Sequence, residues 1–202
     1  GATLGDTAGS SISRNNVTVQ QANPNRIEND SLVYASVGPG YIFGVNPDEV
    51  PITIAGGYRY ELDSFAIDLG GQLVVAGGED SAGASFLATI GAVHFLDPVA
   101  NNSAFVGGGL GLGSITVGND DQAFAGGGLH VKAMAGYEFF RASNMRLVIQ
   151  ADVTLPLYDL EVESSDDNGM AVEGDSKYAP VVGLTVGGGW SKEKRSITGR
   201  HL

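Results

Sequence analysis

The chain has 202 residues, enough for one domain with a sizeable core or for one small barrel. Hydrophobic residues make up 43% and charged residues 17%, which excludes a disordered chain, yet no stretch approaches the roughly 18 to 20 apolar residues of a transmembrane helix. The net charge of −12 excludes general binding to nucleic-acid phosphates, which needs a basic surface, and the absence of cysteine excludes disulfides and thiolate metal sites.

Residues 1–30 are polar and rich in Asn, Ser, Thr and Gln, so they predict a loosely ordered N-terminal arm. From 31 to 190 apolar and polar residues alternate in stretch after stretch, which indicates β-strands, and residues 191–202 form a short C-terminal tail. Helical periodicity is convincing nowhere. The predicted strands cover about 32–45, 50–62, 65–76, 84–96, 104–117, 128–140, 144–158 and 178–190.

Most of these strands are longer than the usual globular strand of about five or six residues, and they match the roughly nine to eleven residues of a tilted strand that crosses a bilayer. The connections add a second pattern, because one end has short turns and the other has mostly longer loops, as in membrane barrels. The short turns are at 63–64, 97–102 and 141–143. The opposite connections are at 46–49, 77–83, 118–127 and 159–177, of which the last two are clearly longer.

The stretch GGYRYELDSFAIDLGGQL, residues 56–73, reads as two strands joined by a tight turn. Apolar and polar residues alternate on both sides of the turn, so each strand has one apolar and one polar face. With a two-residue turn at Asp63 and Ser64, Arg59 lies directly opposite Asp68. The polar face of this hairpin therefore carries a pair of opposite charges.

The hairpin around 141–143 predicts the same arrangement. A three-residue turn there places Glu138 opposite Arg146 and Lys132 opposite Asp152. Side chains just fill the interior of an eight-stranded barrel, and buried charges need partners. We therefore expect a polar barrel interior formed by Arg59, Glu61, Asp68, Gln72, His130, Lys132, Glu138, Arg146, Gln150 and Asp152. Inward glycines on 104–117 are expected to leave room for these long side chains.

The apolar face is expected to point outward to lipid. Its aromatic residues gather toward strand ends, with aliphatic residues between them, which is typical of the aromatic girdles at membrane interfaces. The outward face of 84–96 is left open, because that stretch is apolar on both faces. The girdle residues are Tyr41, Phe43, Tyr58, Tyr60, Phe65, Tyr137, Phe139, Tyr178 and Trp190.

The eight alternating segments, the loop asymmetry and the inward charges in YRYEL, LHVKAMAGYEFF and MRLVIQADVTL resemble the small outer-membrane β-barrels of Gram-negative bacteria, the outer-membrane-protein-A-like and X-like group. The resemblance covers about residues 32–190 and implies an all-β, eight-stranded antiparallel up-and-down transmembrane barrel in the bacterial outer membrane, surrounded by lipid. It also implies periplasmic termini, exposed long loops and a plugged interior. Such barrels commonly end on an aromatic residue, whereas twelve residues follow Trp190 here.

The longest loop contains SSDDNGMAVEGD, which partly fits a calcium-binding loop. Asp166, Asn168 and the following glycine match the pattern, while Ser164 replaces its first Asp and Asp175 its final Glu. No helix flanks the segment, so a solvated acidic loop is the competing interpretation. Calcium is the one cofactor that the sequence suggests.

No combination of Ser, His and carboxylate indicates nucleophilic catalysis, so we expect a non-enzymatic protein. Some members of the resembled group are lipid-modifying enzymes, and His94 with Ser85 keeps that alternative open.

The expected role is structural, or an interaction with an unknown surface or periplasmic protein through the acidic outer loops. Those four loops hold thirteen Asp and Glu residues and one base, Lys177. The first alternative is a narrow passive channel for small solutes or ions. The second is a soluble ligand-binding β-barrel, which requires the apolar face to point inward.

Overall fold

The computed structural model describes residues 31–44, 50–62, 64–78, 81–119, 122–162 and 176–191. The predicted N-terminal arm and almost all of the predicted tail lie outside this part of the chain. The strands are β1 (Ser31–Ile42), β2 (Ile52–Leu62), β3 (Phe65–Ala76), β4 (Ser81–Phe95), β5 (Ser103–Asn119), β6 (Ala123–Phe139), β7 (Met145–Pro156), β8 (Glu161–Val162) and β9 (Val181–Ser191).

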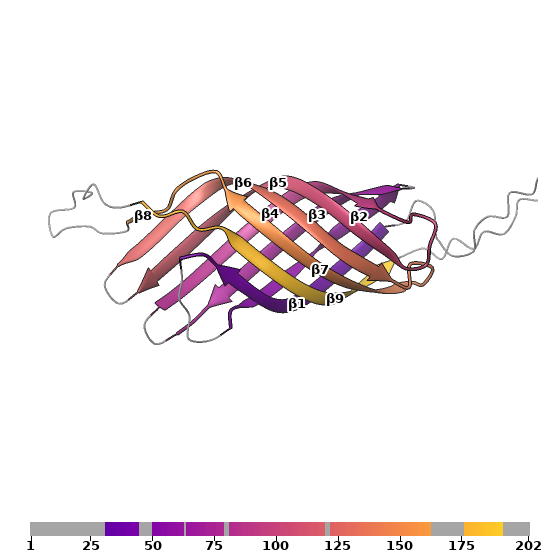
Figure 1. Cartoon of the computed structure of the whole chain (residues 1–202), viewed down its shortest axis with the longest axis horizontal. Helices are drawn as coiled ribbons and strands as arrows, with labels where there is room; N and C mark the ends of the chain where they lie inside the picture. The colour runs from indigo at the N-terminus through magenta and orange to yellow at the C-terminus, as the bar shows by residue number, and fades with distance from the viewer. Residues whose placement is uncertain are drawn as a thin grey trace, which may run out of the picture.

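The strands form one closed barrel, in which long tilted strands wrap around a common axis (Figure 1). The order is β5-β4-β3-β2-β1-β9-β7-β6, every neighbouring pair is antiparallel, and β5 pairs with β6 to close the circle. The two-residue strand β8 adds to the edge of β6 and is not part of the circle. The predicted eight-stranded antiparallel barrel is therefore confirmed.

Alternation along each strand sends one face out and the other in, as the pleat of a β-strand requires. The outer surface carries exposed aliphatic and aromatic side chains on all eight barrel strands, among them Ile54, Leu73, Leu110, Ile149 and Val186. The inner surface carries buried polar and charged side chains. This orientation contradicts the soluble-barrel alternative, which needs the apolar face inside.

The strand whose face was left open, β4, follows the same alternation. Phe86, Ile90 and His94 point outward, while Ser85 and Leu87 are buried inside. His94 and Ser85 therefore lie on opposite faces of the barrel wall and cannot act together in a catalytic site.

The register of the first hairpin is as predicted, and that of the second is not. Arg59 lies directly opposite Asp68 across β2 and β3. Between β6 and β7, however, Glu138 lies opposite Val148 rather than Arg146, and Lys132 lies opposite Thr154 rather than Asp152. The prediction was wrong by two residues, a shift that keeps every side chain on its expected face.

The longer turn has an identifiable cause. Phe140 adopts a positive φ of 60°, a conformation that costs energy for a residue with a Cβ atom. It interrupts the alternation, so that Phe140 is exposed outside the barrel while the next residue, Arg141, is fully buried. The turn therefore runs from Phe140 to Asn144, instead of the predicted 141–143.

The expected ten-residue loop at 118–127 is also wrong. β5 extends to Asn119 and β6 begins at Ala123, so that only residues 120–122 separate them. The two strands reach furthest toward the end of the barrel where β8 lies (Figure 1). Ladder pairing continues because Val117, which is buried inside the barrel, and the partly buried Phe124 pack on an apolar cluster there.

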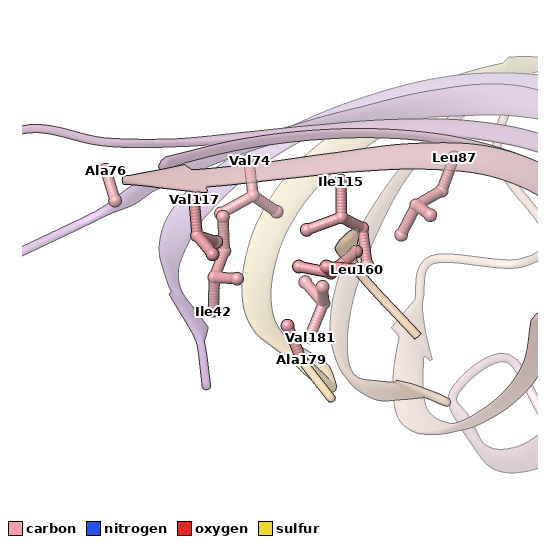
Figure 2. Close-up of a cluster of buried hydrophobic side chains, with 9 residues drawn as sticks. All are labelled: Ile42, Val74, Ala76, Leu87, Ile115, Val117, Leu160, Ala179 and Val181. Atoms are coloured by element: carbon pink, nitrogen blue, oxygen red, sulfur yellow. The ribbon is translucent and has the colours of Figure 1, made fainter. Parts of the chain in front are cut away.

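The sequence predicted a polar barrel interior. The structure shows that the interior also contains two apolar clusters. Figure 2 shows the larger one, whose side chains come from several strands and from the segment after β7. Its residues are Ile42, Val74, Ala76, Leu87, Ile115, Val117, Leu160, Ala179 and Val181. The smaller cluster consists of Ala66, Val93, Phe95, Phe105, Met134 and Val148. Among the described residues no helix is long and apolar enough to cross a membrane.

Candidate functional site: the closed interior and the loop end

Arg146 is the centre of an ion-pair network near the short turns. Its Nη1 atom donates to Glu61 Oε1 at 2.6 Å and to Glu138 Oε1 at 2.7 Å. All three side chains are fully or almost fully removed from water. The pair between Glu138 and Arg146 thus forms diagonally across the ladder, although the two residues do not lie opposite each other.

Arg141 joins this network from the turn between β6 and β7. Its Nη2 atom lies 3.4 Å from Glu61 Oε2, and its Nη1 atom donates to the backbone carbonyls of Asp97 and Pro98 at 3.3 Å each. Its guanidinium carbon is 3.8 Å from the centre of the Phe95 ring, a cation–π contact. The sequence pattern places residue 141 in a short turn, where an arginine side chain is normally solvated.

Arg59 extends the network away from the short turns. Its Nε atom donates to Asp68 Oδ2 at 2.9 Å, and its Nη1 atom donates to Glu138 Oε2 at 3.2 Å. The hydroxyl of Tyr34 donates to the other Asp68 oxygen at 3.0 Å. The Arg59 guanidinium carbon also lies 4.9 Å from the centre of the Phe105 ring, a cation–π contact.

Lys132 links three strands in the middle of the barrel. Its Nζ atom donates to Gln72 Oε1 at 2.7 Å and lies 3.5 Å from Asp152 Oδ1. Nearer the loop end, His130 Nε2 lies 2.9 Å from Thr89 Oγ1. A Cβ atom at Gly111 would overlap the imidazole of His130, so glycine on β5 makes room for this ring.

All ten residues predicted to form the polar interior are buried inside the barrel. With Arg141 added, the buried charges of the described residues are four cations, Arg59, Lys132, Arg141 and Arg146, and four carboxylates, Glu61, Asp68, Glu138 and Asp152. Equal numbers matter, because each unpaired buried charge would cost several kcal/mol. The interior therefore has no net charge to attract an ion of either sign.

The loop end is closed by the segment after β7. Leu160 is fully buried in the larger apolar cluster, and its backbone exchanges two hydrogen bonds with Lys177, at 2.8 and 2.9 Å. The ring of Tyr158 lies over Gly128, and its hydroxyl donates to the Gly113 carbonyl at 3.3 Å. Burial raises the pKa of that hydroxyl.

Lys177 holds the residues that precede β9 against the barrel. Its ammonium group donates to the Gly44 carbonyl and lies 5.5 Å from the centre of the Phe124 ring. The one base of the outer loops therefore binds barrel atoms rather than the neighbouring acids among the described residues.

The predicted girdle residues lie on the outer surface. Eight of the nine are exposed to between 37% and 55%, and Phe139 is half-buried beside Tyr137, with ring centres 4.7 Å apart. Tyr41 and Phe43 form an edge-to-face pair at the other end, with ring centres 5.2 Å apart. Phe140 adds an exposed ring that was not predicted.

The calcium-loop candidate at Ser164, Asp166, Asn168 and Asp175 lies outside the described residues. Within the described ranges, no group of three or more His, Asp or Glu side chains could hold a metal ion.

No protein-family model and no curated protein matches the chain. Solved structures do match. Neisserial surface protein A matches with a TM-score of 0.59 at 10% identity, over 79% of this chain and 96% of its own. Ail, the attachment invasion locus protein of Yersinia pestis, matches with a TM-score of 0.55 at 16% identity, over 82% and 100%. The N-terminal β-barrel domain of Pseudomonas aeruginosa OprF matches with a TM-score of 0.51 at 14% identity, over 82% and 98%.

The chain has the fold of the small outer-membrane β-barrels. The predicted likeness to that class is confirmed at the level of the fold. An outward apolar belt around a charged interior is the arrangement typical of transmembrane β-barrels.

Proposed function

We propose that this protein is a non-enzymatic, non-conducting barrel of the outer membrane, surrounded by lipid, which presents its acidic loops to a partner outside. The observation that carries this proposal is the double closure of the interior. Arg141 and Arg146 lock the short-turn end through Glu61 and Glu138, and Leu160 closes the loop end. A barrel filled in this way can serve as a scaffold for its loops.

The same observation argues against the channel alternative. Conduction through a narrow barrel needs a continuous polar path, whereas an ion would meet an apolar cluster at one end and a neutral, interlocked network at the other. We expect no steady conductance from the wild-type protein in planar bilayers. Stable single-channel currents would overturn the closed-barrel proposal.

The charge of the outer loops indicates the kind of partner. Ail has a solved structure in complex with the heparin analogue sucrose octasulfate. The outer loops of the present chain carry thirteen acids against one base, so they would repel such a polyanion. A cationic protein surface or polybasic segment is the partner class that fits.

A binding experiment on the full chain in lipid vesicles tests this choice of partner. Polylysine is expected to bind at low ionic strength and to dissociate as salt shortens the range of electrostatic attraction, while heparin is expected not to bind. A variant with Asp166, Asp167, Glu173 and Asp175 changed to amides keeps the barrel sequence and should lose most of the polylysine binding. Binding of heparin, or salt-independent binding of polylysine, would contradict the proposal.

A further inference from the structure

An apolar groove crosses the outer surface of the barrel halfway along β2 to β6. It has a volume of about 630 Å³, within the range of roughly 300 to 1,000 Å³ typical of ligand pockets. Its lining is almost entirely hydrocarbon and backbone, because Thr89, the one polar residue among the lining residues, has its hydroxyl beside His130 inside the barrel. Nothing in the charged interior network contributes to it.

The sheet register explains the shape of the groove. Gly56, Gly71 and Ala88 face one another across β2, β3 and β4, and they form the floor. One row of outward residues nearer the short turns forms the side wall, from Leu69 through Ile90 to Leu110. Leu112 and Leu129 continue the floor row onto β5 and β6, where their larger side chains close the groove.

Gly71 is not needed by the barrel itself. A Cβ atom there would meet its nearest neighbour, the Leu87 carbonyl oxygen, at 3.9 Å, which is an ordinary contact. The adjacent Gly57 is different, because a Cβ atom there would overlap the Leu69 carbonyl. Packing inside the protein therefore explains the glycine at 57 but not the one at 71, whose missing side chain hollows out the outer surface.

We infer that this groove holds one hydrocarbon chain of a membrane lipid. The inference rests on the proposed position of the barrel in the outer membrane, where the exposed apolar belt contacts lipid. The groove is continuous with that belt, since Leu69, Ile90, Leu110 and Leu112 are all exposed parts of it. Lipid is therefore the material that covers the groove.

The width of the groove favours a single chain over a protein segment. The rows that flank the floor on β3, at Leu69 and Leu73, are four residues apart, or roughly 13 Å between backbones at about 3.3 Å per residue. Both side chains lean over part of that distance. A helix, about 10 to 12 Å across with its side chains, would not reach the floor. A flexible methylene chain would, and it would replace the packing that Gly71 lacks.

The experiment compares lipid retention by the full chain after reconstitution into vesicles of palmitoyl-oleoyl phosphatidylethanolamine and phosphatidylglycerol. The protein is extracted in mild detergent, and native mass spectrometry counts the phospholipids that remain bound. Gly71→Leu fills the groove. Gly188→Leu is the matched control, because a Cβ atom at this outward glycine of β9 meets its nearest atom at 3.8 Å and lies outside the groove.

Wild type and Gly188→Leu are expected to retain one phospholipid, and Gly71→Leu is expected to retain several-fold less. Equal retention by all three proteins, or none by the wild type, would overturn the inference. A dimer mass that disappears only in Gly71→Leu would overturn it in favour of a second copy of this chain. The shift between unheated and boiled samples on SDS gels tests the proposed membrane barrel separately: its absence in the wild type would defeat that proposal, whatever the lipid count.

Discussion

The guanidinium of Arg141 lies 3.8 Å from the centre of the Phe95 ring, inside the barrel, although Arg141 belongs to a turn. The same group lies beside Glu61 and Glu138. Two carboxylates that would repel each other in a dry interior are thus held by Arg141 and Arg146, and Arg59 also pairs with Glu138. The turn residue is as much part of the interior as any strand residue.

Replacing Arg141 with Gln should destabilise the folded barrel by about 3 to 5 kcal/mol, because it leaves two buried carboxylates with one arginine fewer. Urea titration in detergent or vesicles, followed by circular dichroism, measures the free energy of unfolding. The double variant Arg141→Gln with Glu61→Gln removes one charge of each sign and should recover part of the loss. If the double variant were less stable by the sum of both single effects, Arg141 and Glu61 would not be energetically coupled.

Much of this interior could be predicted from the sequence, because period-two alternation fixes the face of a residue even where the register is uncertain. Glu138 and Arg146 illustrate this: the predicted register was off by two residues, yet both side chains point inward and meet diagonally. Long side chains span such offsets. The burial of Arg141 could not be predicted, because it depends on the backbone dihedral of one preceding residue.

That residue, Phe140, gives a second prediction. Phe140→Gly and Phe140→Ala both remove the ring, but only alanine keeps a Cβ atom at a φ of 60°. Glycine should therefore give the more stable barrel by about 1 kcal/mol, since the left-handed conformation costs other residues about 1 to 2 kcal/mol and glycine loses part of this advantage through its flexible unfolded chain. Urea unfolding of the two variants in the same vesicles checks the sign. A more stable alanine variant would show that the positive φ carries no strain.

The lipid-facing belt predicts an effect that depends on depth. Val131, in the middle of β6, and Met145, at the start of β7 near the short turns, are both exposed on the outer surface. Val131→Arg should lower the free energy of unfolding in vesicles by about 2 to 4 kcal/mol, and Met145→Arg by about 0 to 1 kcal/mol, because the penalty of a charge falls from the bilayer midplane to its interface. Equal effects at the two positions would contradict the membrane orientation derived from the belt.

The loop end shows where sequence patterns stop being informative. The stretch after β7 is acidic and lacks alternation, and it was predicted to be one long loop at 159–177. Its first residues nevertheless turn back into the barrel mouth. There the ring of Tyr158 packs on Gly128, its hydroxyl donates to the Gly113 carbonyl, and Leu160 lies against Gly126. Periodicity describes residues within a strand. It does not describe single side chains that a loop inserts between strands.

Leu160 provides the test of that closure. Leu160→Ala removes a fully buried side chain from the larger apolar cluster and should destabilise the barrel by about 2 to 5 kcal/mol if the segment unfolds together with the strands. Leu157→Ala is the matched control on the same segment, because Leu157 is 62% exposed, and it should change the stability by less than about 0.5 kcal/mol. Urea unfolding measures both variants, and limited proteolysis of the outer loops reports whether the segment opens alone. Faster cleavage in Leu160→Ala with unchanged barrel stability would mean that the segment is an independent lid; equal behaviour of the two variants would mean that Leu160 does not hold the mouth closed.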